Sequence, residues 1–338
     1  MNQKELKDKI GRLFITGWDT PEPSNDFLTF VNRASIGGVI LFGDQCASSD
    51  LIRSGLTAIK QNLNFQPLVA IDQEGGRVCR IKGRPAEYDS AWQYGQQNDL
   101  EGYGQDFSRS AMFLESLGIN LLLGPVADIF VNDQNSCLES RCFGSDAGTV
   151  SLFVTQTVAL AHQAGLLCCL KHFPGLGAAT VDPHIGIPDA DYDLTQWETR
   201  EQIPFADGIS KGADMVMTTH LRLSSFDDAI VTASSQIISS LLRLELGYDG
   251  IIITDDLNME GASEMGDYGE RTLKAFLAGH DLLLFGQNWQ AAQEGYERLL
   301  LAFDKGEITP ERLNFSLERI TSLRYKLDQF SVSSHGAH

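Results

Sequence analysis

The sequence predicts an α/β fold built from eight strand–helix units, and three observations lead to this prediction. Eight short apolar runs recur along the 338 residues, bounded by Gly, Asp or Asn. Longer segments with helical spacing lie between the runs, and no stretch rich in Pro, Gly and Ser divides the chain. Repeated strand–helix units form a parallel sheet with right-handed crossovers, and eight of them most naturally close into a single (β/α)8 TIM-type barrel.

The apolar runs have the composition of strands that are covered on both faces. They are short, rich in Val, Ile and Leu, and mostly apolar at successive positions, as in parallel sheets. In chain order the runs are Arg12–Gly17, Gly37–Gly43, Pro67–Asp72, Ile119–Asp128, Leu166–His172, Asp214–His220, Gly250–Asp255 and Asp281–Gly286. An open doubly wound sheet is the alternative, but the phosphate-binding GxGxxG expected after its first strand is missing.

Several segments between and after the runs carry apolar residues at helical spacing. Gly247 follows one of them, at the position where a helix is expected to stop. The expected helices are Ser49–Asn62, Thr149–Ala164, Ser235–Leu246, Gln290–Phe303 and Pro310–Leu327. We therefore expect residues 1–330 to form one catalytic barrel domain and residues 331–338 to form a flexible tail.

Composition and charge exclude several classes of function. Lys and Arg number 26 against 45 Asp and Glu, for a net charge of -19. A surface this acidic repels phosphate backbones and anionic membranes, so we expect no nucleic-acid and no membrane partner. The sequence contains no transmembrane segment and no signal peptide, which predicts a cytoplasmic protein. The six cysteines include no CxxC, so neither a disulfide framework nor a zinc site is indicated.

Five of the runs end in polar side chains, and in a barrel these strand ends lie where active sites are found. In chain order they are Asp72, Asp128, Lys171, His172, His220, Asp255 and Asp256. Asp128 and His220 fit a structural role in tying loops to the barrel equally well. Consecutive residues at a strand end point in different directions, so we expect only one of Asp255 and Asp256 to face the site. A carboxylate there can be a nucleophile or a metal ligand.

The long loop after the fifth run carries Asp182 two residues before His184. An Asp in this position can orient an imidazole and stabilise its charged form, which suits a general acid or base. The same spacing also fits a surface turn. No HxH and no short cluster of metal ligands occurs, so we expect no metal.

Four motifs in this order resemble those of the family 3 glycoside hydrolases. They are AIDQEGGRV at 70–78, SRCFGSD at 140–146, KHFPGLG at 171–177 with DPH at 182–184, and ITDDLNMEGA at 253–262. The resemblance extends from about Leu13 to about Lys326 and is specifically to the bacterial β-N-acetylhexosaminidases of peptidoglycan recycling.

The resemblance implies an exo-acting, retaining β-N-acetylglucosaminidase that needs no cofactor. Its substrates would be small carbohydrates with a terminal β-linked N-acetylglucosamine, such as muropeptide or chitin fragments. Asp255 matches the nucleophile, His184 the acid/base on a mobile loop, and Asp182 the dyad partner of that histidine. The residues that match sugar-binding positions are Asp72, Arg80, Arg141, Lys171 and His172.

Two residues depart from the family motifs. Leu176 stands where His is common, and Pro183 stands where Ser or Thr is common. Pro183 disfavours helical geometry at the residue before it and removes one N–H donor. Neither departure removes a catalytic group, and both bear on the conformation and motion of the loop.

Other functions remain open on sequence alone. A phosphorylase could use the same site, since a His acid/base would not repel phosphate. A β-glucosidase-like member of the family would take its acid/base from a further domain, for which we expect this chain to be too short. A Schiff-base aldolase through Lys171 and a non-catalytic sugar-binding protein belong to other classes. The sequence leaves the aglycone and the oligomeric state open, and a monomer is compatible with it.

Overall fold

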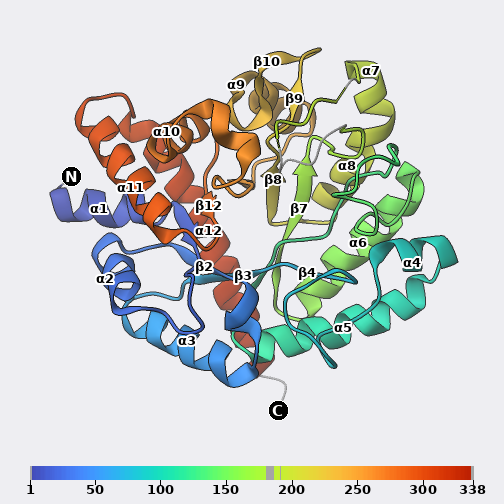
Figure 1. The fold of residues 1–338 in the computed structure, drawn as a ribbon, viewed down its shortest axis with the longest axis horizontal. Coiled ribbons are helices and arrows are strands. Elements are labelled where there is room, and N and C mark those ends of the chain that lie inside the picture. The colour runs from blue at the N-terminus through green and yellow to red at the C-terminus, as the bar shows by residue number, and fades with distance from the viewer. Residues whose placement is uncertain (1, 180–185, 191, 336–338) are drawn as a thin grey trace.

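The computed structural model describes residues 2–179, 186–190 and 192–335, and within them eight parallel strands form a barrel (Figure 1). The neighbours around the barrel run β11, β8, β7, β6, β3, β2, β1, β12. Their bounds are β1 Phe14–Thr16, β2 Gly38–Leu41, β3 Leu68–Ile71, β6 Leu121–Leu122, β7 Leu167–Phe173, β8 Met215–Thr218, β11 Ile251–Thr254 and β12 Leu283–Phe285. A parallel bridge between Ile253 and Leu282 joins the two ends of this order and closes the barrel.

Every barrel strand coincides with one of the eight apolar runs, with β7 extending one residue beyond its run to Phe173, so the predicted barrel is confirmed. β6 is the shortest, because Pro125 follows closely and has no N–H to donate to a neighbouring strand. Pairing resumes beyond it with a parallel bridge between Val126 and Lys171. Two short antiparallel hairpins decorate the loops that follow β3 and β8: β4 Gln73–Gly75 with β5 Val78–Cys79, and β9 Arg222–Leu223 with β10 Asp227–Ile230.

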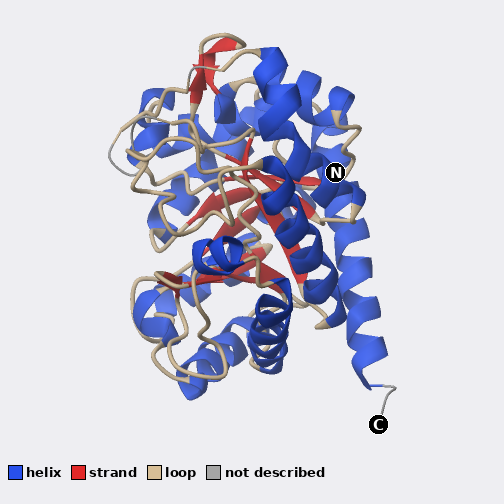
Figure 2. Cartoon of the chain, turned by 90° about the vertical axis from the view of Figure 1, so that its right-hand side faces the viewer, coloured by secondary structure: helices blue, strands red, loops and turns tan. Residues whose placement is uncertain are grey.

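Helices surround the barrel (Figure 2). Their bounds are α1 Gln3–Gly11, α2 Asn25–Ala34, α3 Ser49–Gln61, α4 Ala91–Gln97, α5 Leu100–Ser116, α6 Ala147–Gln163, α7 Leu194–Gln196, α8 Gln202–Ser210, α9 Ser235–Ile237, α10 Tyr268–Ala278, α11 Trp289–Asp304 and α12 Pro310–His335. The predicted helix at 235–246 is split, since α9 continues as a π-helix over Ile238–Glu245 before Gly247. α12 continues to His335, into the segment for which the sequence predicts a tail, because no Gly or Pro occurs before Gly336.

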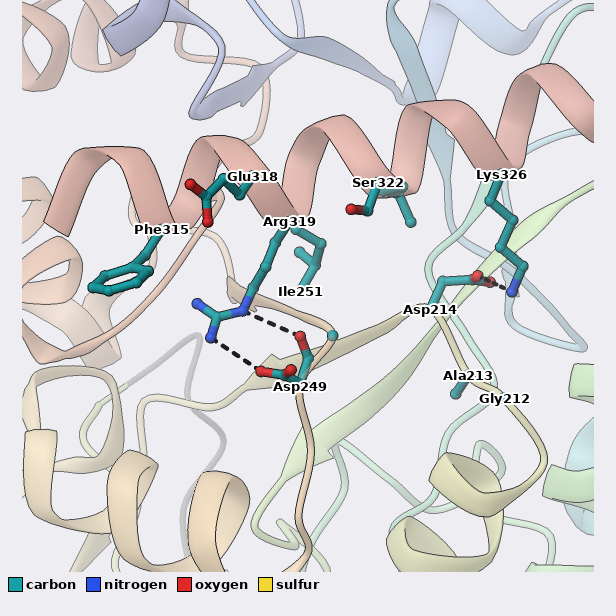
Figure 3. A pocket seen from close by; sticks show the side chains of 12 residues that line it. Gly212, Ala213, Asp214, Asp249, Ile251, Phe315, Glu318, Arg319, Ser322 and Lys326 are labelled. Atoms are coloured by element: carbon teal, nitrogen blue, oxygen red, sulfur yellow. Dashed lines mark hydrogen bonds and ion pairs between the residues drawn. The ribbon is translucent and has the colours of Figure 1, made fainter. Parts of the chain in front are cut away.

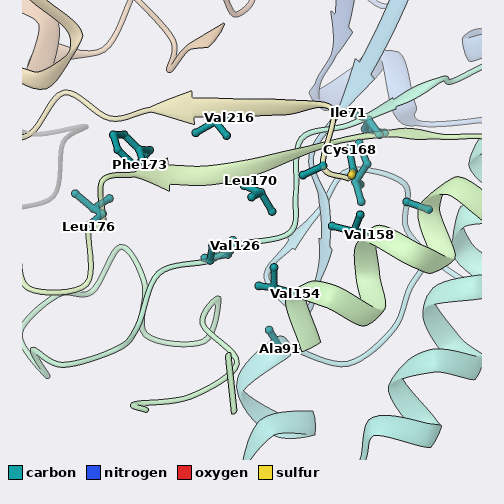
Figure 4. Close-up of a cluster of buried hydrophobic side chains, with 14 of the residues drawn as sticks. Ile71, Ala91, Val126, Val154, Val158, Cys168, Leu170, Phe173, Leu176 and Val216 are labelled. Carbon is teal, nitrogen blue, oxygen red and sulfur yellow. The ribbon is translucent and has the colours of Figure 1, made fainter. Parts of the chain in front are cut away.

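Side-chain alternation along the strands sends successive residues to opposite faces of the barrel wall. In β7, Leu167 and Cys169 belong to a buried cluster that includes the barrel interior and extends to α1, α2 and α10–α12, whereas Cys168 and Leu170 belong to a second cluster, against other outer helices. Figure 4 shows Cys168 and Leu170 turned towards Val158 and its neighbours on α6. Both faces of the strands are therefore apolar, as the composition of the runs predicts.

Two further predictions can be compared with the structure. All six cysteines are free thiols, as their spacing predicts. Across the residues that the structure describes, none of the helices combines the length and the apolarity that a membrane span requires.

Candidate active site

A cavity of about 450 Å³ lies where the barrel strands end. Its apolar lining comes mainly from inward-facing residues at the strand ends, among them Ile40, Leu123, Met217 and Leu284. Six of the residues predicted for the site line the same cavity: Asp72, Arg80, Arg141, Lys171, His172 and Asp255. The two other predicted residues, Asp182 and His184, lie outside the described residues.

Strand alternation explains how Lys171 reaches the cavity. Leu167 and Cys169 face the barrel interior, so Lys171, two residues further along β7, follows on the same side. Its side chain is only 3% exposed. Such a buried ammonium group requires partners, and β3 and the hairpin after it supply them.

The Lys171 ammonium group lies between two carboxylates. Its Nζ is 2.7 Å from Asp72 Oδ1 and 2.6 Å from Glu74 Oε1. Arg80 Nη2 approaches the other Asp72 oxygen at 3.3 Å. Arg141 binds Glu74 through two parallel hydrogen bonds, Nε to Oε2 at 2.8 Å and Nη2 to Oε1 at 2.9 Å. The five side chains form one network of opposite charges, which is buried except for the partly exposed Arg80.

The network fixes the protonation of its members. Burial alone would raise the pKa of Asp72 and of Glu74, but the positive charges of Lys171 and Arg80 or Arg141 outweigh burial and lower both pKa values. Burial alone would lower the pKa of Lys171, and the charges of Asp72 and Glu74 raise it instead. At neutral pH both carboxylates and the ammonium group therefore remain charged.

Asp128 orients the imidazole ring of His172 through a hydrogen bond. Its Nδ1 lies 2.6 Å from Asp128 Oδ2, and its Nε2 lies 3.3 Å from Arg141 Nη2. Because arginine only donates, Nε2 is the acceptor of that contact and Nδ1 carries the proton that Asp128 accepts. Asp128 is fully buried, so of the two roles left open for it the structure supports the structural one.

The two consecutive carboxylates after β11 have different surroundings. Ile251 and Ile253 face the barrel interior, and Asp255 continues their alternation towards the cavity. Asp256 Oδ1 accepts hydrogen bonds from the backbone N–H of Asn258 and of Gly286. Asp256 thus joins the loops after β11 and β12, although its side chain also borders the cavity.

His220, for which a site role and a structural role are both open on sequence alone, supports the backbone directly after β11. Its Nδ1 lies 2.8 Å from Thr232 Oγ1, and its Nε2 lies 3.0 Å from the backbone oxygen of Asp256. The residue is fully buried and does not line the cavity. The structure therefore supports the structural reading of His220.

The loop after β7 is anchored at its beginning. Leu176 N–H donates to Asp128 Oδ1 at 2.7 Å, and Leu176 O accepts from the Asn135 amide at 2.9 Å. Gly177 packs so closely that a Cβ atom there would lie 1.7 Å from the Ile129 backbone oxygen. Leu176 itself is buried and lines the cavity, so this departure from the family motif adds apolar surface to the site.

The far side of the same loop is anchored to the hairpin after β8. Arg222 N–H donates to Pro188 O at 2.9 Å, and Ala190 N–H donates to Arg222 O at 3.2 Å. Tyr192 O–H donates to Gly175 O at 3.0 Å and so connects the two sides of the loop. The described parts of the loop are therefore held by specific contacts on both sides of residues 180–185.

Comparison with known proteins identifies the family. The model of the glycosyl hydrolase family 3 N-terminal domain matches residues 5–323. The chain belongs to glycosyl hydrolase family 3. It is 32% identical to β-hexosaminidase A of Pseudoalteromonas piscicida, over 90% of this chain and 55% of that protein, and 29% identical to a β-hexosaminidase of Vibrio cholerae, over 92% and 93% respectively.

Solved structures of family 3 agree with this assignment. A glycoside hydrolase family 3 β-N-acetylglucosaminidase from Paenibacillus sp. superimposes with a TM-score of 0.92 at 31% identity, over 96% of this chain and 62% of that chain. This chain therefore spans somewhat more than half of two of these relatives and nearly all of the Vibrio protein.

One residue of the candidate site is not among the sequence predictions. Glu74 is 5% exposed on its side chain and contacts both Arg141 and Lys171. The signal that could have found it is its spacing, since Asp72 and Glu74 are two residues apart and an extended chain places both on one side. On sequence alone, Glu74 stands inside the motif AIDQEGGRV at 70–78 but has no role assigned to it.

Among the described residues, a single group of His, Cys, Asp and Glu side chains has the spacing of metal ligands: His162, Cys168 and Asp214. It lies at the other end of the barrel, beside a separate cavity of about 570 Å³ that α12 borders (Figure 3). The Lys326 ammonium group already binds Asp214 Oδ1 there. A cation would have to displace that ammonium group, so this cluster is an ion-pair network rather than a fitting metal site.

Proposed function

We propose that this protein is an exo-acting, retaining β-N-acetylglucosaminidase that removes terminal β-linked N-acetylglucosamine. The observation that carries the proposal is the gathering of Asp72, Arg80, Arg141, Lys171, His172 and Asp255 around one cavity. The names of the relatives, β-hexosaminidases and a β-N-acetylglucosaminidase, support the same choice.

The cavity suits a single neutral sugar. Its volume of about 450 Å³ lies within the range of small-molecule sites. Charged donors on Lys171 and Arg141 stand beside the carboxylate acceptor of Asp72. Sugar hydroxyls donate and accept at once, so alternating donors and acceptors fix the ring by directional hydrogen bonds.

The proposed reaction proceeds by two displacements at the anomeric carbon. Asp255 attacks C1 as the bond from C1 to the leaving oxygen breaks, and His184 protonates that oxygen. A covalent glycosyl-enzyme on Asp255 results. His184 then takes a proton from water, which attacks C1 and releases Asp255. Asp182 orients His184 and stabilises its charged form.

The role of His184 can be tested through the leaving group. We expect His184→Ala to lose the general-acid contribution, roughly 10²- to 10⁴-fold, on natural glycosides with poor leaving groups. An activated aryl glycoside needs little protonation and should lose much less. Equal losses on the two substrates would show that His184 is not the acid.

The kinetics of Asp182→Asn distinguish a role of Asp182 through His184 from a direct sugar-binding role. If Asp182 acts through His184, Asp182→Asn lowers kcat and leaves KM nearly unchanged. A large rise in KM at constant kcat would instead place Asp182 in contact with the sugar.

The surroundings of Lys171 argue against the Schiff-base alternative. An amine attacks a carbonyl only when it is neutral, and Lys171 has a raised pKa between Asp72 and Glu74. Borohydride with a keto substrate should therefore trap no adduct on this residue.

One assay tests the proposal against the other two enzyme activities. Hydrolysis of p-nitrophenyl N-acetyl-β-glucosaminide is measured beside the corresponding glucoside, each with and without phosphate. We expect release of free N-acetylglucosamine and weak activity on the glucoside. Formation of N-acetylglucosamine 1-phosphate would identify a phosphorylase, and preference for the glucoside would identify a β-glucosidase-like enzyme.

The biological setting that we propose is the cytoplasmic turnover of peptidoglycan fragments. Muropeptides and chitin oligomers present the same terminal sugar, and a net charge of -19 is compatible with a small carbohydrate substrate. Fractionation of the source cells, together with assays on both kinds of fragment, would separate these settings.

A further inference from the structure

Glu74 is buried at the edge of the cavity and contacts two of the predicted sugar-binding residues at once. The inference drawn from this residue rests on the proposed glycosidase function. Its two oxygens accept the paired hydrogen bonds of Arg141 at 2.8 and 2.9 Å, and Oε1 also lies 2.6 Å from Lys171 Nζ. Arg141 follows β6 and Lys171 lies in β7, so Glu74 is the group that connects side chains from two separate parts of the barrel.

The backbone around Glu74 fixes where its carboxylate lies. Gln73, the preceding residue, is buried on the opposite side, and its amide binds the backbone of Arg80 and Ile81. Gly75 has a φ of +83°, and a Cβ atom there would lie 2.3 Å from the Asp89 oxygen. Glu74 therefore stands on a tightly held hairpin that cannot easily shift its carboxylate.

Charge balance gives Glu74 a second effect. The buried network contains three cations, Arg80, Arg141 and Lys171, and only two carboxylates, Asp72 and Glu74. Asp255, which lines the same cavity, supplies the third negative charge, and the opposite formal charges of Arg77 and Asp256, which also line it, offset each other. The formal charges of these groups thus cancel, which suits a neutral sugar. Without the charge of Glu74 the cavity would carry an uncompensated positive charge.

We propose that Glu74 is a positioning and specificity residue: it holds Arg141 and Lys171 in place for the sugar and keeps the cavity unattractive to inorganic oxyanions. It acts through these two side chains and takes no part in bond making. Its loss has two separate consequences, one on substrate binding and one on anion binding.

Glu74→Gln keeps the size of the side chain and removes its charge. An amide oxygen in the position of Oε1 can still accept from Arg141 Nη2 and from Lys171, but the amide NH2 in the position of Oε2 is a donor and leaves Arg141 Nε without its acceptor. We expect kcat/KM on p-nitrophenyl N-acetyl-β-glucosaminide to fall roughly ten- to hundredfold through misplacement of these groups, mostly as a rise in KM. Competitive inhibition by sulfate should become roughly tenfold stronger, because the cavity gains a net positive charge.

Two variants control this experiment. Glu87→Gln removes one negative charge from the same region, but Glu87 does not line the cavity, so kcat/KM and the sulfate inhibition constant should match the wild type. Glu74→Asp keeps the charge on a shorter side chain. It should lose part of kcat/KM while its sulfate inhibition remains that of the wild type, and it keeps the test open if Glu74→Gln does not fold.

The outcomes separate clearly. A folded Glu74→Gln enzyme with unchanged sulfate inhibition, or with unchanged kcat/KM, overturns the proposal, and so does a Glu74→Asp enzyme that behaves like the wild type in kcat/KM. A wild-type protein that does not hydrolyse the substrate overturns the proposed function instead. In that case sulfate titration by calorimetry reads the charge effect without turnover, and equal affinity in wild type and Glu74→Gln again overturns the role of Glu74.

Discussion

At the scale of single residues, the site depends on which charges are compensated. Asp256 accepts backbone hydrogen bonds from Asn258 and Gly286, and burial raises its pKa. Asp255 instead continues the inward alternation of Ile253. The neighbouring carboxylates thus have separate tasks: Asp256 holds two loops together, and Asp255 faces the substrate cavity.

This division predicts different results for substitution of the two residues. Asp255→Ala should abolish turnover, because no covalent intermediate can form. Asp256→Ala should retain measurable turnover and lose stability, since two backbone N–H groups lose their acceptor, a cost of about 1–3 kcal/mol. Steady-state kinetics and urea unfolding of both variants provide the measurement. An active Asp255→Ala enzyme would contradict the division.

Glu201 provides a second prediction at this scale. It is 1% exposed and lies against Gly175, at the start of the loop after β7. Its Oε1 accepts from Arg200, whereas Oε2 is buried and finds no partner among the described residues. Burial, with a smaller contribution from the charge of Asp128, raises the pKa of Glu201 to about 7 despite the opposing charge of Arg200.

A raised pKa in the folded state makes stability depend on pH in a defined direction. The contribution of Glu201 is complete below its unfolded pKa near 4.5 and is lost as pH rises through its folded value of about 7. Relative to Glu201→Gln, the wild type should therefore lose up to about 3 kcal/mol between pH 5 and pH 8. Urea unfolding of both proteins at the two pH values measures this. An equal difference at both pH values would refute the assignment.

Sequence reasoning predicted some of these residues and missed others for physical reasons. Lys171 and Asp255 could be predicted because a parallel strand carries its last inward residue to the barrel mouth. Arg80 and Arg141 lie in the loops that follow β3 and β6, where no periodicity indicates direction, and only the resemblance to family 3 pointed to them. Glu74 was missed because its role depends on a partner 67 residues away.

At the scale of elements, the described parts of the loop after β7 are anchored to other loops of the barrel. Leu176 is held by Asp128 and Asn135, and Tyr192 connects the far side of the loop back to Gly175. The positions of the strands could be predicted, because burial on both faces leaves a continuous apolar run, although β6 occupies only two of the ten residues of its run. The anchoring of the loop could not be predicted, because its partners come from the loop after β6 and from the hairpin after β8.

The close packing at Gly177 gives a prediction for this element. In Gly177→Ala the new methyl group would overlap the Ile129 oxygen, 1.7 Å away before any relaxation. The loop must then move, at a cost of about 1–3 kcal/mol. We expect kcat/KM to fall roughly 10²-fold, since displacement by about 1 Å suffices for such a loss.

Gly148→Ala is the matched control for this substitution. Gly148 lies in α6, and a Cβ atom there would have Asp146 Oδ1 as its nearest neighbour, at 3.4 Å. The substitution should leave activity unchanged and add about 0.5–1 kcal/mol of stability through helix propensity. Wild-type kcat/KM in Gly177→Ala would contradict the proposed importance of the loop anchor.

At the scale of the whole molecule, the barrel separates the site from the contacts that hold α12. The candidate site cavity lies where the strands end, whereas α12 crosses the opposite end, where Lys326 binds the buried Asp214 (Figure 3). The eight apolar runs and the polar residues at their ends predicted which end of the barrel carries the candidate site. The sequence did not predict that α12 continues past the expected end at Leu327, because helix propensity there is ordinary.

The separation of the two ends predicts a variant with altered stability and normal activity. Lys326→Met leaves Asp214 with His162 and the backbone N–H of Cys168 as partners and should destabilise the protein by about 1–3 kcal/mol. Its kcat/KM should match the wild type. Lys211→Met, at an exposed lysine of the same end, should change neither quantity. Loss of activity in a folded Lys326→Met protein would show coupling between the two ends.

The measurement that bears most directly on the proposed mechanism is the location of the covalent intermediate. A mechanism-based 5-fluoro glycoside of N-acetylglucosamine is incubated with the wild-type protein, which is then digested and mapped by mass spectrometry. We expect a single labelled peptide, with the sugar on Asp255, and retention of configuration in the released product. A label on Asp256, or inversion at the anomeric carbon, would contradict a retaining mechanism that proceeds through Asp255.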